Sequence, residues 1–170
     1  MVRLRHIFKK GRLVSTREGS FVTKLAQKIV KGIKPYCRKI EIVGSIRRKE
    51  KNPADIDITL IPKNQESKEK IGQKLSGMGK RLSGGEQRAF FKIEGVEVEI
   101  YYTSAEEWGA ALMSYSGPFG ANIGLRIIAR SKGFKLNQHG LFRHGLRVAG
   151  KTEEEVYRAL GREWKPPEKR

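Results

Sequence analysis

Residues 39–61 read KIEIVGSIRRKEKNPADIDITLI, and this stretch decides the fold. Residues 39–43 alternate in polarity and are rich in β-branched side chains, which predicts a strand ending at a Gly-Ser pair. Residues 56–61 predict a second strand by the same pattern. Alternate residues of a strand point to the same face, so Asp55 and Asp57 are expected to project side by side.

Two neighbouring carboxylates suit a pair of hard divalent cations, because Mg²⁺ accepts such oxygens while keeping waters and phosphate oxygens as further ligands. Gly44 and Ser45 fill the turn between the two strands. A glycine there lets backbone amides approach a phosphate, and the serine hydroxyl adds a donor. Arg48 can bind phosphate oxygens bidentately. The alternative interpretation is that the aspartates cap a strand and that the arginines form a solvated basic run.

A two-metal centre needs a third carboxylate. Residues 96–100, Val-Glu-Val-Glu-Ile, supply it on a neighbouring predicted strand. Glu97 and Glu99 share one face of that strand, so the alternation of side chains leaves both as candidates. An alternating Val/Glu strand is also typical of a half-exposed sheet edge, which is the alternative here.

The rest of the chain changes character near Ser104, from strands to helices. We therefore expect an α+β fold, with a mixed or antiparallel sheet and flanking helices over residues 1–104 and a small, mainly helical lobe over residues 105–170. A Thr152-x-x-Glu155 capping box predicts the start of the last helix. The other predictions are a basic leader over residues 1–12, helices over 20–32, 65–75, 105–115, 122–131 and 151–160, strands over 90–93 and 96–102, and a Gly- and Ser-rich loop over 76–85.

The composition favours a polyanionic partner. Thirty-six Lys and Arg residues against 18 Asp and Glu give a formal net charge of +18, and nucleic acid fits this charge best because each neutralised phosphate releases a counterion. The sequence contains no basic helix with a broad Trp, Phe and Leu face, so membrane binding is less favoured than nucleic-acid binding. A soluble basic protein without a polyanionic partner is the remaining alternative.

Cys37 is the single cysteine, which excludes an internal disulfide. The leader lacks the apolar core of a signal peptide, so we expect an intracellular, cytoplasmic or nucleoid-associated monomer with no membrane segment.

Several separated motifs resemble those of the family X DNA polymerases. Gly44-Ser45-Ile46-Arg47-Arg48 followed by Asp55-Ile56-Asp57 resembles the family's nucleotidyltransferase signature. Ser114-Tyr115-Ser116-Gly117 is similar to the family's nucleotide-contacting turn, usually Tyr-Phe-Thr-Gly. Residues 132–137 and the end of the chain also resemble the family's last lobe. The resemblance covers roughly residues 16–170, with the motifs in the family's order.

This resemblance implies a nucleotidyltransferase palm over residues 1–104 and a nucleotide- and DNA-contacting lobe over residues 105–170. It implies that Asp55, Asp57 and Glu99 bind two Mg²⁺ ions, with Mn²⁺ able to substitute. Glu99, rather than Glu97, falls on the family's third catalytic aspartate, and glutamate there is a departure from the family's pattern. Further implied contacts are Gly44, Ser45, Arg48 and Arg17 to the triphosphate, Ser114, Tyr115, Gly117 and Asn122 to the nucleotide, and Arg126 to the template strand.

The implied activity is extension of a primer 3′-hydroxyl on DNA from nucleoside triphosphates, in repair or gap filling. Too little chain precedes Gly44 for the N-terminal helical domain that family members usually carry, so we expect the palm and terminal lobe alone. Ser114 stands where the family commonly has a tyrosine that crowds the sugar 2′ position, which implies weak selection against ribonucleotides. The rival interpretations are a tRNA end-adding or small-molecule-modifying nucleotidyltransferase, and a non-catalytic basic module that binds nucleic acid.

Overall fold

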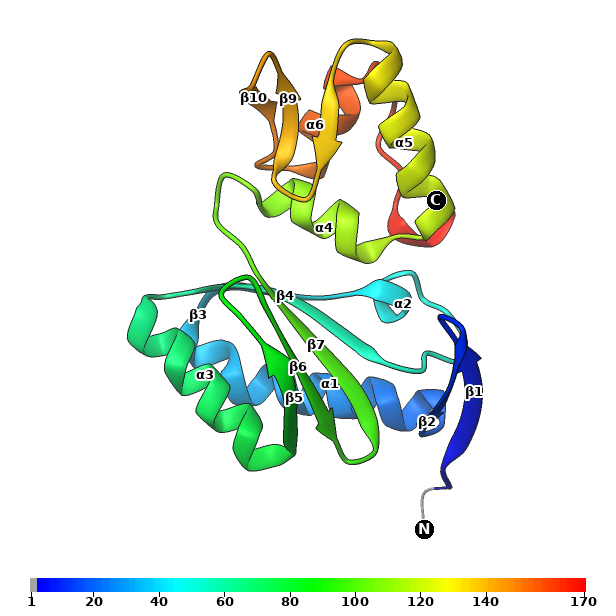
Figure 1. Ribbon diagram of the computed structural model, residues 1–170, viewed down its shortest axis with the longest axis vertical. Helices are drawn as coiled ribbons and strands as arrows, with labels where there is room; N and C mark the ends of the chain where they lie inside the picture. Colours follow the sequence, from blue (N-terminus) through cyan, green and yellow to red (C-terminus); the bar gives the residue numbers. More distant parts are fainter. Residues whose placement is uncertain (1–2) are drawn as a thin grey trace. The chain divides into compact units, whose positions relative to one another are not determined.

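A computed structural model describes residues 3–170, which form two compact units (Figure 1). The first unit runs up to residue 46 and continues over residues 50–102. The second comprises residues 47–49 and 103–170, so the three residues Arg47–Lys49 pack with the later part of the chain. No helix within the described residues is long and apolar enough to cross a membrane.

A five-stranded mixed sheet forms the centre of the first unit, in the order β3-β4-β7-β6-β5. β4 and β7 are parallel, whereas every other neighbouring pair is antiparallel. The expected mixed sheet is therefore confirmed. The strand bounds are Cys37–Val43 for β3, Ile56–Pro62 for β4, Lys80–Gly84 for β5, Arg88–Ile93 for β6 and Val96–Tyr102 for β7.

Helices α1 (Gly19–Ile33) and α3 (Gln65–Met78) cover one face of this sheet (Figure 1). Both present apolar residues at helical spacing, and burying such a stripe against a sheet is what stabilises an amphipathic helix. The Asn64 side chain begins α3 by accepting a hydrogen bond of 2.8 Å from the backbone N–H of Ser67. The core side chains are Val22, Leu25, Ile29 and Ile33 of α1, Ile71 and Leu75 of α3, and Ile56, Ile58, Leu60, Phe91, Ile93, Val98 and Ile100 of the sheet.

Alternation along the strands leaves a polar set on the opposite face of the sheet. On β4, Ile56 and Ile58 point into the core, so Asp57 between them points away from it. On β7, Val98 and Ile100 are buried in the same core, and Glu99 points to the same side as Asp57. The fold therefore builds a carboxylate-bearing surface on the face that the two helices leave uncovered.

Two segments of the first unit differ from expectation. From Arg3 on, the expected basic leader is instead a hairpin of β1 (Arg5–Lys9) and β2 (Arg12–Thr16), while residues 1 and 2 lie outside the described part. Part of the loop expected over residues 76–85 is strand β5, which pairs with β6 at the edge of the sheet. All five β5 residues are exposed, so the strand has no alternation of buried apolar and exposed polar residues from which it could be predicted.

The second unit combines helices with a three-stranded antiparallel sheet that the sequence did not predict. Its core includes Met113, Leu141, Val156 and Leu160. The predicted capping box is confirmed, since the Thr152 hydroxyl accepts from the Glu155 N–H at 3.1 Å. The bounds are Trp108–Ser116 for α4, Phe119–Ser131 for α5, Glu153–Ala159 for α6, Lys135–Asn137 for β8, Gly140–Arg143 for β9 and Leu146–Ala149 for β10.

Short helical turns complete the chain. A 3-10 turn, η1, covers Lys34–Tyr36 and leads into β3, and another, η2, covers Pro167–Lys169 at the end of the chain. α2 is a single turn over Gly44–Arg47. It begins directly after β3, so the turn that carries the phosphate-binding candidates follows the buried last residue of that strand, Val43.

Candidate active site

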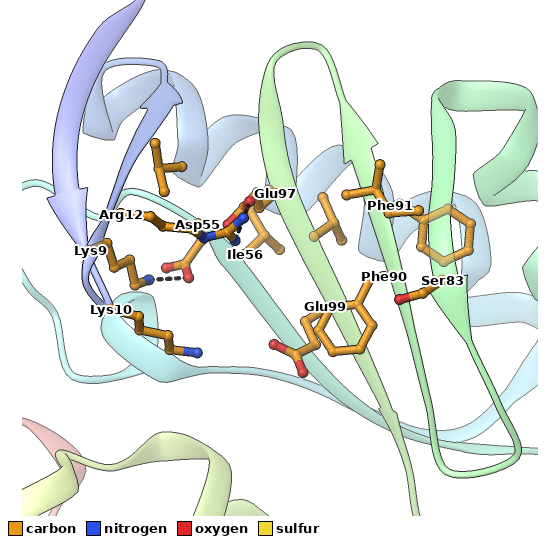
Figure 2. A pocket seen from close by; sticks show the side chains of 13 residues that line it. Lys9, Lys10, Arg12, Asp55, Ile56, Ser83, Phe90, Phe91, Glu97 and Glu99 are labelled. Carbon is orange, nitrogen blue, oxygen red and sulfur yellow. Dashed lines mark hydrogen bonds and ion pairs between the residues drawn. The ribbon is translucent and has the colours of Figure 1, made fainter.

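Three carboxylates gather at the start of the parallel strand pair. Asp57 of β4 lies opposite Glu99 of β7 in the strand register, and both point away from the core. Asp55 immediately precedes β4 and lines a pocket of about 230 Å³ together with Glu97 and Glu99 (Figure 2). The first unit thus brings together the three acidic residues that the sequence singled out.

The electrostatics of this group are those of crowded negative charge. Burial, followed by the charges of Asp55 and Glu99, raises the pKa of Asp57 to about 7, although the Tyr101 hydroxyl donates to its Oδ1 at 3.3 Å. Burial also raises the pKa of Glu99, whose carboxylate lies 3.8 Å from Nη1 of Arg88. Charges held in this way favour a ligand of opposite sign.

Glu97 has a different environment from Glu99. Its Oε1 accepts a hydrogen bond of 2.9 Å from Nη2 of Arg12 in the N-terminal hairpin. In the antiparallel register with β6 it faces Lys92, whereas Glu99 faces Phe90. The charge of Glu99 acts on Asp57, and the strand register places Glu99 opposite that aspartate. The role of Glu99 as a metal ligand stays a prediction.

Gly44 has a conformation and a neighbour that both require glycine. Its φ is +63°, a left-handed value that disfavours side chains. A Cβ placed on it would collide with the carboxylate of Asp57. The next residue, Ser45, has a buried hydroxyl oxygen with no hydrogen-bond partner in the described part of the chain. A buried donor of this kind is costly without a ligand.

Arg47 and Arg48 follow this turn in sequence but belong to the second unit. Nη1 of Arg48 donates to the backbone carbonyl of Ser116 at 2.5 Å. Nη1 of Arg47 donates to the hydroxyl of the same serine at 2.7 Å and to Oε1 of Glu153 at 2.8 Å. The two arginines therefore hold the Ser116-Gly117 turn that the sequence associated with nucleotide contacts.

The other second-unit candidates lie close together along α4 and α5. Nδ2 of Asn122 donates to the carbonyl of Ser114 at 2.9 Å, which joins the end of α4 to the start of α5. Gly117, between the helices, has φ +64°. Tyr115 is half-buried, whereas Arg126 is exposed on α5, a helix that carries basic but no acidic residues.

Arg17 is not brought to the carboxylates. Its Nε donates to the carbonyl of Glu94 at 3.0 Å, and its guanidinium lies 5.6 Å from the centre of the Phe21 ring. It does not line the pocket that holds Asp55 and Glu99. The expected triphosphate contact of this residue stays a prediction without geometric support.

The donor set fits a divalent cation in its chemistry. Carboxylate oxygens are the ligands that Mg²⁺ and Mn²⁺ prefer. The pKa of Asp57 is raised first by burial and then by the charges of Asp55 and Glu99, and a cation would offset both causes. The three carboxylates do not converge in a closed cage: within residues 3–170 no three His, Cys, Asp or Glu side chains are close enough to enclose an ion. Instead, Asp55 Oδ2 forms an ion pair with Nζ of Lys9.

Comparison with known proteins gives the family. Residues 111–170 match the family described as DNA polymerase beta thumb. A protein called repair DNA polymerase X, from an isolate of African swine fever virus, is 31% identical over 147 residues, which cover 81% of this chain and 84% of the viral protein. The chain belongs to the family X DNA polymerases. As a member of this family it is a DNA-directed DNA polymerase, as the motifs predicted.

Other relatives of the family X chain agree with this assignment. The protein of the same name from a second virus strain is also 31% identical over 147 residues. DNA polymerase IV of Saccharomyces cerevisiae is 34% identical over 73 residues, which cover 43% of this chain and 12% of the yeast protein. The assignment therefore rests on the long viral match, with the shorter yeast match consistent with it.

Two sets of side chains that contact the motif residues of this family X chain were missed by sequence reasoning. The hairpin tip adds Lys9, Lys10 and Arg12 to the carboxylate pocket. The available signal was weak: Gly11 lies between two segments with β-branched or aromatic residues, but Lys10-Gly11 is not one of the dipeptides typical of a two-residue hairpin turn. The second is Glu153, which binds Arg47 across 106 positions of sequence, and no local pattern indicates such a pair.

Proposed function

We propose that the chain extends a primer 3′-hydroxyl by phosphoryl transfer in DNA repair or gap filling, using Mg²⁺ or Mn²⁺ ions held by Asp55, Asp57 and Glu99. The observation that carries this proposal is the register of Asp57 against Glu99, with Asp55 at the start of the same strand. The repair context is supported by the relatives, which are called repair DNA polymerase X.

In the proposed reaction, the primer hydroxyl oxygen forms a bond to the α-phosphorus of a nucleoside triphosphate. The bond from that phosphorus to its bridging oxygen breaks, pyrophosphate leaves, and the proton of the hydroxyl would pass to a site carboxylate or to water. Divalent cations bound by the carboxylates would lower the pKa of the hydroxyl and stabilise the charge on the phosphate oxygens. The protein's own contribution is mainly positioning and charge.

The outer phosphates are assigned to Gly44, Ser45 and Arg48. Ser45 has the buried hydroxyl without a partner in residues 3–170, and a phosphate oxygen would accept its hydrogen bond. Gly44 has no Cβ, so its backbone can lie against Asp57. The guanidinium of Arg48 would add charge-assisted hydrogen bonds, and its contact with the Ser116 carbonyl fixes its orientation.

The second unit is assigned the nucleotide and the template. Ser114, Tyr115, Gly117 and Asn122 would contact the nucleotide, and exposed Arg126 would contact a template phosphate. The Asn122–Ser114 hydrogen bond supports a fixed turn geometry at this place. Because Ser114 is small, selection against ribonucleotides at the sugar is weak in this proposal.

Primer extension tests the function directly. Recessed, gapped and single-stranded DNA are each incubated with one nucleotide at a time, with Mg²⁺, with Mn²⁺ and with EDTA. We expect metal-dependent addition to the primed substrates. Transfer onto tRNA or an aminoglycoside with no extension of DNA would replace the proposal by another nucleotidyltransferase activity. Tight DNA binding with no turnover in either metal would indicate a non-catalytic binding module.

A further inference from the structure

The N-terminal hairpin ends directly at the carboxylate pocket. β1 and β2 are in register from Arg5 opposite Thr16 to Lys9 opposite Arg12. The two turn residues, Lys10 and Gly11, have φ values of +50° and +77°, as a tight two-residue hairpin turn requires. The tip therefore presents three cationic side chains, Lys9, Lys10 and Arg12, and all three line the pocket (Figure 2).

The base of the hairpin is fixed by backbone acceptors. Nζ of Lys92 donates to the carbonyl of Ser15 at 2.8 Å, and Nη2 of Arg5 donates to the carbonyl of Pro53 at 3.2 Å. Neither of these bonds involves a site carboxylate. The position of the hairpin beside the sheet therefore does not depend on the charges at its tip.

The tip cations, in contrast, are held by the acidic residues of the site. Nζ of Lys9 pairs with Oδ2 of Asp55, and Nη2 of Arg12 binds Oε1 of Glu97 at 2.9 Å. Figure 2 shows Lys9 extending from the hairpin to Asp55, with Lys10 on the same side of the pocket. The charge of Lys10 acts favourably on ionised Glu99. The hairpin thus supplies part of the positive charge that offsets the carboxylates.

A divalent cation at Asp55 would compete with the Lys9 ammonium for the same oxygens, and the two cations would repel each other. The displaced lysine then lies at the edge of a metal site whose substrates are phosphates, which are the natural acceptors for an ammonium group. We propose that the hairpin tip is a DNA phosphate-binding element, with Lys9 held on Asp55 until a divalent cation at that aspartate releases it. This inference rests on the proposed function, because it takes DNA as the ligand and Asp55 as a metal ligand.

The opposite face of the hairpin suits the same ligand. Phe8 and Leu13 are paired in register and are 76% and 69% exposed. Phe8 adjoins Lys9 in the strand, although its ring lies on the other face. An exposed aromatic ring on a basic element is a feature of proteins that bind single-stranded nucleic acid, in which bases stack on rings and phosphates contact cations. The strand that the tip would hold is therefore a DNA strand with unpaired or frayed bases near the site.

The first test measures metal affinity without DNA or nucleotide, by electron paramagnetic resonance of Mn²⁺. Lys9→Gln removes the competing cation and should tighten Mn²⁺ binding about 2- to 5-fold, the size expected for a partly exposed ion pair. Lys9→Arg should stay near the unmodified protein. The matched control is Lys28→Gln, which removes an equal charge from a surface pair with Glu94, 3.7 Å apart and outside the pocket. Equal effects of Lys9→Gln and Lys28→Gln would overturn the proposal.

The second test measures the affinity for a recessed-end DNA by fluorescence anisotropy over a salt series, once in EDTA and once in Ca²⁺. Each phosphate contact contributes about 0.9 to the slope of log affinity against log salt on duplex DNA, and about 0.7 on a single strand. Lys9→Gln should lower the slope by about 1 in Ca²⁺ and leave it nearly unchanged in EDTA, where Lys9 is paired with Asp55. Phe8→Ala should weaken binding without changing the slope.

The outcomes separate the two proposals. Unmodified protein that binds no DNA would contradict both the proposed function and the hairpin assignment. Normal DNA binding with the same slope for Lys9→Gln and the unmodified protein in Ca²⁺ would contradict the hairpin assignment alone. A slope change of equal size in EDTA and Ca²⁺ would also overturn the metal-dependent release. Thermal melting of each variant checks that the fold is retained.

Discussion

Arg47 binds both carboxylate oxygens of Glu153, with Nη1 at 2.8 Å from Oε1 and Nη2 at 2.9 Å from Oε2. The same carboxylate accepts from Nη2 of Arg170 at 3.0 Å and from Nε1 of Trp164 at 3.1 Å. Burial alone would raise the pKa of Glu153, but the hydrogen bonds and charges of the two arginines outweigh it and lower that pKa. This cluster ties the stretch after the Gly44-Ser45 turn to the rest of the second unit.

The first prediction follows from the burial of this cluster. The side chains of Glu153 and Arg170 are only 5% and 3% exposed, so Glu153→Gln leaves two arginines near the interior without a counter-charge. We expect a loss of about 3–5 kcal/mol in the free energy of unfolding, measured by urea denaturation near neutral pH. Glu154→Gln, on the exposed side of the same helical turn, is the matched control and should cost little.

The pH dependence of this variant has a definite sign. Because the folded-state pKa of Glu153 is depressed, its stabilisation is present above the pKa of the unfolded chain and is lost as pH falls through the folded pKa. The difference between Glu153→Gln and the unmodified protein should therefore be largest at pH 6–8 and shrink below about pH 4. A difference that stays constant from pH 7 to pH 3 would show that packing, rather than charge, explains the effect.

The second prediction ranks the four carboxylates of the first unit. Asp55→Asn, Asp57→Asn and Glu99→Gln should each lower single-turnover primer extension by several orders of magnitude while DNA affinity is kept or increases. Glu97→Gln is the matched control for Glu99→Gln, because it makes the same change two residues away on the same face. It should be mild, since its carboxylate is engaged by Arg12. The reverse order for the two glutamates would transfer the metal-binding role to Glu97.

The third prediction concerns the metal-free protein. The pKa of Asp57 is about 7 in the folded state, above that of an unfolded aspartate near 4, so this group destabilises the fold as pH rises through that window. In EDTA, Asp57→Asn should raise Tm at pH 8 by several degrees relative to the unmodified protein, and the difference should disappear near pH 4. Calorimetry at both pH values measures it. Addition of Mg²⁺ at pH 8 should stabilise the unmodified protein and leave Asp57→Asn nearly unchanged.

Residue patterns within a single helix or strand were sufficient to predict several elements of this fold. The pleat of β4 placed Asp55 and Asp57 on one face, and the period of residues 20–32 predicted α1, which spans Gly19–Ile33. The family resemblance then chose between Glu97 and Glu99, a choice that alternation alone left open. In the structure, Glu99 lies opposite Asp57 on the neighbouring strand. Reasoning from a single strand does not include such a cross-strand neighbour.

Interactions that depend on distant partners were not predictable. Strand β5 is exposed along its length and exists because it pairs with β6, so its residues resemble a loop. The contact of Lys9 with Asp55 spans 46 positions, and that of Arg47 with Glu153 spans 106. Arg47 and Arg48 follow the Gly44-Ser45 turn in sequence, and their packing with the second unit is a tertiary result that the motif does not encode.

The last prediction concerns sugar selection. The side chain of Ser114 is short and ends in a hydroxyl, whereas the family's turn commonly carries a tyrosine ring at this position. The backbone carbonyl of Ser114 accepts a hydrogen bond of 2.9 Å from Nδ2 of Asn122. We expect a fixed backbone with a small side chain to leave space at the sugar 2′ position of a bound nucleotide. Loss of a steric clash worth roughly 1–3 kcal/mol corresponds to about a 10- to 150-fold change in discrimination.

We therefore expect weak discrimination between matched ribo- and deoxyribonucleotides, measured as the ratio of kcat/KM values on gapped DNA. Ser114→Tyr should increase that ratio by about one to two orders of magnitude, because a ring at this position would meet the 2′-hydroxyl. Ser114→Ala, which keeps the side chain small, is the control and should leave the ratio unchanged. A deoxy preference above about a thousandfold that is equal in the unmodified protein and Ser114→Tyr would contradict a role for this position. The gate would then be formed by another group in the turn, for which the neighbouring Tyr115→Ala variant provides the next measurement.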